Sequence, residues 1–195
     1  LAILAGFGIT ELAQLVERST WRKPLQLLFL CLALVQSLAM TVQSNLLLGR
    51  EDTRYSLAEW IEEHTEAGDS IAMEAFAHLD NKYYWAGYQG RNTYVYWPES
   101  AVGRAKAVSG EYRYVVISTF GYAAWQLDGA PSSAIPEEYR LLEREGELLA
   151  TIAPGPRNSD IPYSQDDMYT PFWHLFDRER PGPTIKIYRL ERVVR

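Results

Sequence analysis

Hydrophobic and polar positions divide the chain into two parts near residue 49. Residues 24–48 are strongly apolar and contain no Asp, Glu, Lys or Arg. This stretch is long enough to cross a bilayer as a helix, which takes roughly 20 residues. Residues 1–16 begin apolar and become polar, as the last half of a membrane helix would. We therefore predict a transmembrane helical hairpin in residues 1–49, formed by the last two helices of a longer bundle, and a folded domain in residues 50–195.

Basic residues between the two apolar stretches predict the orientation of the chain. Arg18, Arg22 and Lys23 lie there with Trp21 beside them. Lys and Arg concentrate in short cytoplasmic loops, and Trp favours the membrane interface. We expect a multi-pass protein of the plasma (inner) membrane, with residues 50–195 extracytoplasmic or periplasmic.

Two other interpretations of the apolar stretches stay open. A secretory signal is one, although here the basic residues follow the first apolar run instead of preceding it. A buried helical hairpin in a soluble protein is the other, because Gln26, Gln36 and Gln43 dilute the second run. In a membrane bundle, the same glutamines could face partner helices.

Residues 50–195 alternate between helical and extended patterns. Leu57, Trp60 and Ile61 recur at helical spacing, and Asp52 or Thr53 can cap that helix. Apolar runs predict strands at residues 70–75, 93–97, 111–118, 148–153 and 184–190. Helices are expected at residues 77–88 in part, 98–109, 119–127 and 136–144. This alternation predicts a three-layer α/β domain with a largely parallel sheet. Residues 154–182 are long for a loop, and we expect them to be functional or mobile.

Charge and cysteine content exclude several classes of function. The chain has a net charge of −6, and 16 of its 19 Lys and Arg but 23 of its 25 Asp and Glu lie in residues 50–195. An acidic domain is a poor candidate for nucleic acid, because phosphate neutralisation dominates that binding. Cys31 is the only cysteine, so an intrachain disulfide and a Cys-based zinc site are excluded.

Motifs for common catalytic chemistry are absent from the sequence. It has no P-loop, G-x-G-x-x-G, G-x-S-x-G or H-E-x-x-H, and its three histidines share no ligand spacing. Asp166 and Asp167 could bind a divalent cation, and a solvated turn is the alternative. We predict no catalytic residue, no metal ligand and no cofactor in this chain.

Aromatic residues give the densest signal for binding. Seven Tyr and Trp residues fall between positions 83 and 97. Such amphipathic rings can stack on sugar faces or lie at a membrane surface, and they can equally fill a core. Arg91 could hydrogen-bond an anionic or hydroxylated ligand, and Arg54, close to the membrane exit, could meet a phosphate or simply form an ion pair at a helix start. The candidate substrate-binding residues are Arg54, Tyr83, Tyr84, Tyr88, Arg91 and Trp97.

The order of short motifs resembles one family of membrane enzymes. A membrane helix runs into D-T-R-x-x-x-A-x-W-I-E at residues 52–62, and A-G-D-S-I-A follows at residues 67–72. Y-Y-x-x-G, Y-V-V-I-S and R-P-G-P-x-I-x-I-Y-R-L come next, at residues 83–87, 114–118 and 180–190. This order resembles the carboxy-terminal part of GT-C-fold glycosyltransferases that use polyprenyl-phosphate sugars, the group of protein mannosyltransferases and aminoarabinose transferases.

The resemblance implies a lipid-linked sugar donor, an extracytoplasmic acceptor (glycan, lipid or protein) and contact with membrane lipid. It also implies that the catalytic acid, and any divalent cation, belong to an early extracytoplasmic loop that no residue here matches. This chain would supply the cap domain. A non-catalytic membrane-anchored binding or scaffold domain is the alternative, and the sensor half of a signalling protein is another.

Overall fold

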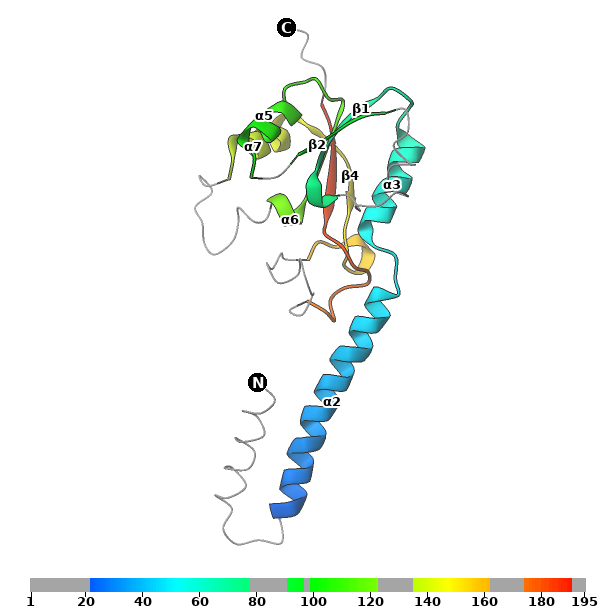
Figure 1. Ribbon diagram of the computed structural model, residues 1–195, viewed down its shortest axis with the longest axis vertical. Coiled ribbons are helices and arrows are strands. Elements are labelled where there is room, and N and C mark those ends of the chain that lie inside the picture. Colours follow the sequence, from blue (N-terminus) through cyan, green and yellow to red (C-terminus); the bar gives the residue numbers. More distant parts are fainter. Residues whose placement is uncertain (1–21, 78–90, 97–98, 123–134, 162–173, 191–195) are drawn as a thin grey trace. The chain divides into compact units, whose positions relative to one another are not determined.

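The computed structural model describes residues 22–77, 91–96, 99–122, 135–161 and 174–190 (Figure 1). The chain forms two compact units, Leu1–Leu46 and Leu47–Arg195. The first segment of the predicted hairpin, in residues 1–16, lies outside the described residues.

Helix α2, Arg22–Leu48, is apolar on every side. Four consecutive side chains, from Leu27 to Leu30, are exposed, and residues in a helix follow one another at about 100° around its axis. Polar side chains farther along bond back to the helix itself: Thr41 Oγ1 donates to the Ser37 carbonyl at 2.8 Å, and Asn45 Nδ2 to the Thr41 carbonyl at 3.0 Å. Among the described residues, α2 gives one helix long and apolar enough to span a membrane.

Helix α3, Thr53–His64, opens the second unit. Asp52 is its N-cap and accepts a hydrogen bond from the Arg54 N–H at 2.9 Å, as the sequence predicted. Thr53, Leu57 and Ile61 form its buried stripe. Four residues, 49–52, separate the end of α2 from the start of α3.

Five strands form one sheet in the order β2-β1-β3-β5-β4. Their bounds are Ser70–Glu74 for β1, Asn92–Tyr96 for β2, Tyr114–Ser118 for β3, Glu147–Ile152 for β4 and Ile185–Arg189 for β5. Every predicted strand is therefore present, within a few residues of its predicted ends.

The prediction of a largely parallel sheet is only partly correct, because the sheet is mixed. Strands β2, β1 and β3 pair in parallel, whereas β5 pairs antiparallel with both β3 and β4. The chain leaves β4 and returns as β5 through residues 153–184, in which the described part contains only short helical turns such as η5, Pro156–Asn158. When a connection leaves one strand and enters its neighbour at the same end of the sheet, the two strands are antiparallel.

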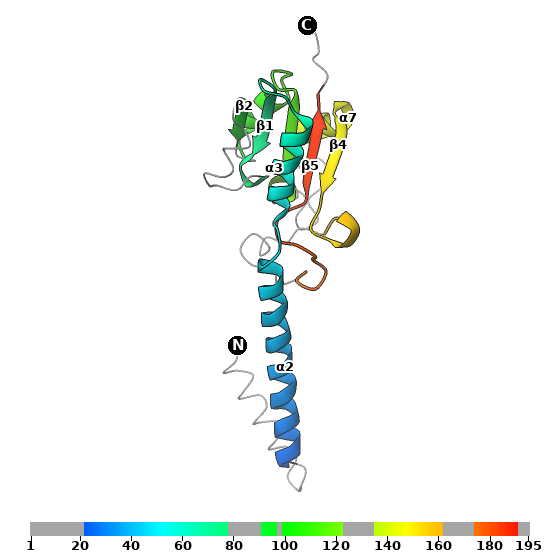
Figure 2. The same ribbon diagram turned by 90° about the vertical axis from the view of Figure 1, so that its right-hand side faces the viewer.

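Helices cover both faces of the sheet, as Figures 1 and 2 show. Leu57 and Ile61 of α3 pack with Ile71 and Met73 of β1 on one face. The other face carries α5, Ala101–Ala107, and α7, Glu137–Glu145, in a cluster that includes Ala72 of β1. Successive β1 residues thus point to opposite layers, which is the three-layer arrangement expected from the alternating pattern.

Local signals at helix ends agree with the sequence. Ser100 caps α5 by accepting the Gly103 N–H at 3.0 Å. Pro136 precedes α7, and Gly146 ends it. Two short helices follow parallel strands directly: η1, Ala75–Ala77, comes after β1, and α6, Thr119–Tyr122, comes after β3.

Candidate functional site at the carboxyl ends of the parallel strands

The chain connections that leave β1 and β3, which are neighbours in the sheet, run toward opposite edges of the sheet. The chain leaves β1 toward β2 at one edge of the sheet, and it leaves β3 toward β4 at the other edge. In open α/β sheets, ligands bind outside the carboxyl ends of the strands where the connections diverge in this way. The carboxyl ends of β1 and β3 are therefore where a site is expected.

Glu74, the last residue of β1, is fully buried at this point. Its Oε2 accepts the Ser118 N–H at 2.6 Å and the Ser118 hydroxyl at 3.2 Å. Its Oε1 accepts the Tyr139 hydroxyl of α7. One carboxyl group thus joins the ends of β1 and β3 to the helix that covers them.

Gly121 of α6 makes room for this carboxyl. A Cβ atom at position 121 would lie 2.5 Å from Glu74 Oε2 and 2.7 Å from Glu74 Oε1, which is closer than side chains tolerate. The glycine is therefore required by the approach of the carboxyl group and not by an unusual backbone angle.

The environment of Glu74 changes its protonation. Burial raises the pKa of the Glu74 carboxyl from 4.5 to about 7, although the bonds from Tyr139 and Ser118 and the charge of Arg104 oppose that rise. Burial and the neighbouring Glu74 also raise the pKa of the Tyr139 and Tyr96 hydroxyls, so both stay neutral. Glu74 is therefore the group here that can gain or lose a proton near neutral pH.

A small recess lies next to this cluster. Tyr96, Arg104, Glu138 and Tyr139 line it together with apolar residues of β3, of α7 and of the C-cap of α5. Arg104 is nearly buried, and its Nε lies 3.8 Å from a Glu138 carboxylate oxygen. The charge of Arg104, partly offset by Glu138, therefore acts on Glu74 from this side.

The arrangement can hold or release one proton, but it does not expose that proton to solvent. All three partners of the Glu74 carboxyl in the described part of the chain are internal groups. Within the described ranges, no group of three His, Cys, Asp or Glu side chains could hold a metal ion. The described residues support a structural or binding role for this end of the sheet.

No protein-family model, curated protein or solved structure matches this chain. The family resemblance in its sequence motifs stays a prediction.

Arg54, one of the predicted binding residues, pairs within its own helix turn. Its Nε and Nη2 donate to the two carboxylate oxygens of Asp52 at 2.8 and 2.7 Å. This two-pronged contact is the ion pair at a helix start that the sequence left open as the alternative. The pair uses the Nε–Nη2 edge of the Arg54 guanidinium group, which was predicted to contact a phosphate.

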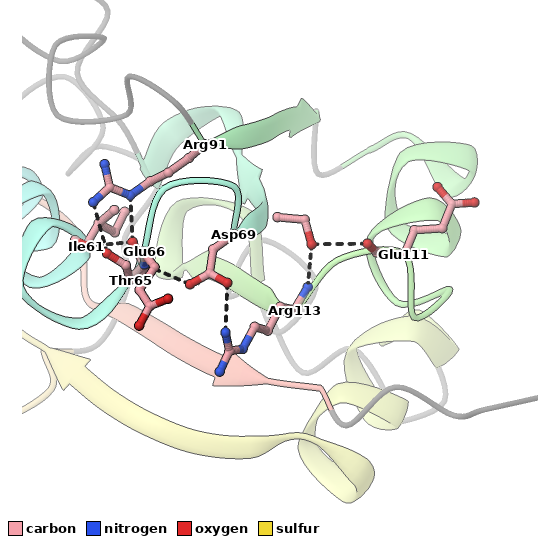
Figure 3. A network of polar contacts seen from close by, with 8 residues as sticks. Ile61, Thr65, Glu66, Asp69, Arg91, Glu111 and Arg113 are labelled. Carbon is pink, nitrogen blue, oxygen red and sulfur yellow. Dashed lines mark hydrogen bonds and ion pairs between the residues drawn. The ribbon is translucent and has the colours of Figure 1, made fainter.

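Arg91 directly precedes Asn92, which pairs with Ser70 at the start of β1, whereas Glu74 is the last residue of that strand. Figure 3 shows Arg91 with its partner Thr65. Arg91 precedes β2, and its Nε and Nη2 donate to the Thr65 hydroxyl at 2.7 Å and the Thr65 carbonyl at 3.1 Å. Nearby, Asp69 accepts the Glu66 N–H at 2.9 Å and the Arg113 Nη1 at 2.8 Å. These contacts tie the end of α3 to the amino ends of the parallel strands.

The remaining predicted residues, Tyr83, Tyr84, Tyr88 and Trp97, lie outside the described residues. In the sequence, Trp97 directly follows the carboxyl end of β2, and the three tyrosines belong to the connection that follows β1. Of the six predicted residues, the structure describes Arg54 and Arg91, which bond near opposite ends of α3.

Sequence reasoning missed Glu74, although a signal was present. The strand at residues 70–75 reads S-I-A-M-E-A, with one acid in a run otherwise fit for burial. Alternation along a strand places Glu74 on the same face as Ala72. The run was predicted as a buried strand, and an acid buried there requires hydrogen-bond partners.

Proposed function

We propose that this chain is the carboxy-terminal part of a multi-pass glycosyltransferase of the plasma membrane that transfers a sugar from a polyprenyl-phosphate carrier to an extracytoplasmic acceptor. Residues 50–195 are its extracytoplasmic domain. The catalytic acid belongs to another part of the enzyme, and this domain positions the acceptor or the lipid carrier.

One observation carries the proposal: the apolar helix α2, which has no charged residue after Lys23, leads after only four residues into α3 of an α/β domain. A helix that is apolar on all sides belongs in a membrane or in the interior of a large protein. Such a short connection keeps the domain at the membrane surface, where lipid-linked sugars are presented. The order of the motifs at residues 52–62, 67–72, 114–118 and 180–190 supports the same family.

The ligand-binding end of the domain is the carboxyl end of β1, β2 and β3. The aromatic residues of the connections that start there, Tyr83, Tyr84, Tyr88 and Trp97, are the candidates for sugar stacking. Arg91 serves the structure at the other end of the sheet, so we assign it no ligand in this proposal.

The first experiment tests the membrane segment and its orientation. One portion of membranes that contain the full chain is washed with alkaline carbonate, and sealed vesicles of each orientation from a second portion are treated with protease. We expect the chain to stay in the membrane fraction and residues 50–195 to be cleaved only from the extracytoplasmic side. Release by carbonate would contradict the proposal and favour a soluble protein with a buried hairpin.

The second experiment tests sugar transfer. Membranes with the intact enzyme are supplied with a radiolabelled polyprenyl-phosphate sugar, and transfer to endogenous acceptors is measured. Trp97→Ala should lower transfer while folding is retained, and Val102→Ala, at an exposed position of α5, is the matched control. Correct membrane insertion without any transfer would favour the non-catalytic binding or scaffold domain.

A further inference from the structure

One segment of the domain is attached to the residues with which the domain begins. Residues 174–184, orange to red in Figure 1, pack against the residues that follow α2. Arg50 Nη1 donates to the Glu179 carbonyl at 2.5 Å, and the Thr53 N–H donates to the Pro181 carbonyl at 3.0 Å. The Thr53 hydroxyl donates to the Pro183 carbonyl at 2.8 Å. This segment is thus attached at three points to the start of the domain.

The same segment presents an aromatic side chain to solvent. Residues 174–177 form a turn closed by the Asp177 N–H on the His174 carbonyl at 3.1 Å. Leu175 is buried, whereas Phe176 is 63% exposed. Arg178 is buried on the other side and donates to the Gly182 carbonyl at 2.9 Å. Because Leu175 before the ring and Arg178 two residues after it are both anchored, the turn holds Phe176 outward.

The exposed ring of Phe176 lies near the first residues of the domain, which directly follow α2 in the chain. Glu179 bonds to Arg50, which comes two residues after Leu48, the last residue of α2. Phe176 is three residues from Glu179, so their Cα atoms are at most about 11 Å apart. Leu48 is itself exposed, so the apolar surface of α2 continues to its last residue.

Charge on this surface does not favour an acidic lipid. Arg50 is exposed, but so are Glu51, Asp177 and Glu179. The acids outnumber the cation, so attraction to anionic headgroups is not expected. A ring at the lipid–water boundary is favoured by its apolar area alone, as in the aromatic belts of membrane proteins.

We propose that Arg50, Phe176, Asp177 and Glu179 form a lipid-facing lip, which rests on the bilayer surface with the Phe176 ring inserted among the lipids. This inference depends on the proposed membrane span of α2. The partner is the interfacial layer of a zwitterionic bilayer.

The test uses the full chain, reconstituted in phosphatidylcholine vesicles and carrying one environment-sensitive fluorophore on a cysteine. The label is placed at the native Cys31 in α2, or, in a Cys31→Ser background, at Asp177→Cys or at Val102→Cys. Position 102 is 78% exposed on α5 and serves as the matched control. Lipids that carry a quencher about 5–10 Å into the headgroup–acyl boundary are then added.

We expect lipid quenching that is several-fold stronger at position 177 than at position 102. Adding Phe176→Ser should reduce the quenching at position 177 toward the control value, and anionic lipid should not change it. Equal quenching at 177 and 102, with the Cys31 label quenched, would overturn the lip and leave the membrane span intact. An unquenched label at Cys31 would overturn both.

Discussion

The two ends of the parallel strands use charge in opposite ways. At the amino ends, Asp69 and Arg113 form an ion pair with the Arg113 side chain half exposed, and Arg91 bonds to Thr65 beside them (Figure 3). At the carboxyl ends, Glu74 is buried and has neutral hydrogen-bond donors as its partners. The attraction within a solvent-exposed ion pair contributes little to stability, because the loss of hydration nearly offsets it. For a buried carboxyl, loss of any hydrogen-bond partner leaves a polar group unsatisfied and lowers stability.

The difference also sets the pH response. Burial alone would raise the pKa of Asp69, but the bonds from the Glu66 N–H and Arg113 and the charge of Arg91 hold it below its ordinary value. Burial moves the pKa of Glu74 the other way, to about 7. The two ends of one sheet therefore contribute to stability with opposite signs of pH dependence.

Removal of the Glu74 side chain should give the largest effect. Glu74→Ala leaves the Ser118 N–H and the Tyr139 hydroxyl buried without their acceptor, so we expect a loss of about 3 kcal/mol in the free energy of unfolding. Asp69→Ala is the matched control, with an expected loss of about 1 kcal/mol or less. Urea unfolding of the detergent-solubilised chain, followed by near-ultraviolet circular dichroism, measures both. Equal losses would remove the contrast between the two ends.

A pH series should separate the two ends by sign. Glu74 keeps its proton in the folded chain up to about pH 7, whereas the unfolded chain loses it near 4.5. The folded state thus binds more protons in this window, and stability falls as pH rises from about 4.5 to 7, by up to about 3 kcal/mol. Asp69 acts below this window, because its lowered pKa makes stability fall as pH drops below about 4.

Thermal unfolding from pH 3 to 8 tests this prediction. Glu74→Gln should flatten the decline between pH 4.5 and 7, and Asp69→Asn should change only the acid side. If stability still declines between pH 4.5 and 7 in Glu74→Gln, another titrating group causes that decline.

The sequence predicted the helices and strands better than it predicted which strands pair and in which direction. The helix that begins after Pro136 and the strand that ends at Ser118 were both predicted, because local periodicity and capping encode them. The direction of β5 was not, since it depends on how residues 153–184 return to the sheet. Pairing between distant segments leaves no mark in a local pattern.

The candidate site shows the same limit. Arg91, a predicted ligand contact from an aromatic cluster, precedes β2 and so lies at the amino end of that strand; the ligand contact itself stays a prediction. Position relative to a strand could have been used to place it away from a carboxyl-end site. The dependence of Glu74 on Gly121 and Tyr139 joins residues 47 and 65 positions apart, which no spacing rule detects.

Substitution of Gly121 should reveal the close packing of the carboxyl ends. Gly121→Ala puts a methyl group on the Glu74 carboxyl, with an expected loss of about 1–3 kcal/mol. The loss should shrink in a Glu74→Ala background, because the two groups no longer compete for space. Gly68→Ala is the control at the amino end: its surroundings are open, but its positive φ of 94° adds backbone strain, so its loss should be unaffected by Glu74→Ala. Additive losses at 121 and 74 would contradict the packing argument.

The smallest effect should come from the Asp69–Arg113 pair, whose Arg113 Nη1 and Asp69 Oδ1 atoms are 2.8 Å apart. A double-mutant cycle with Asp69→Asn and Arg113→Gln should give a coupling energy of about 0.2–1 kcal/mol. Because the Arg113 side chain is half exposed, this coupling should weaken as salt is raised toward 1 M. The cycle of Glu74→Gln with Tyr139→Phe should be insensitive to salt, since its atoms are buried. A salt-independent coupling at Asp69–Arg113 would mean that the amino ends are as enclosed as the carboxyl ends, and the contrast between them would then rest on the Glu74 proton alone.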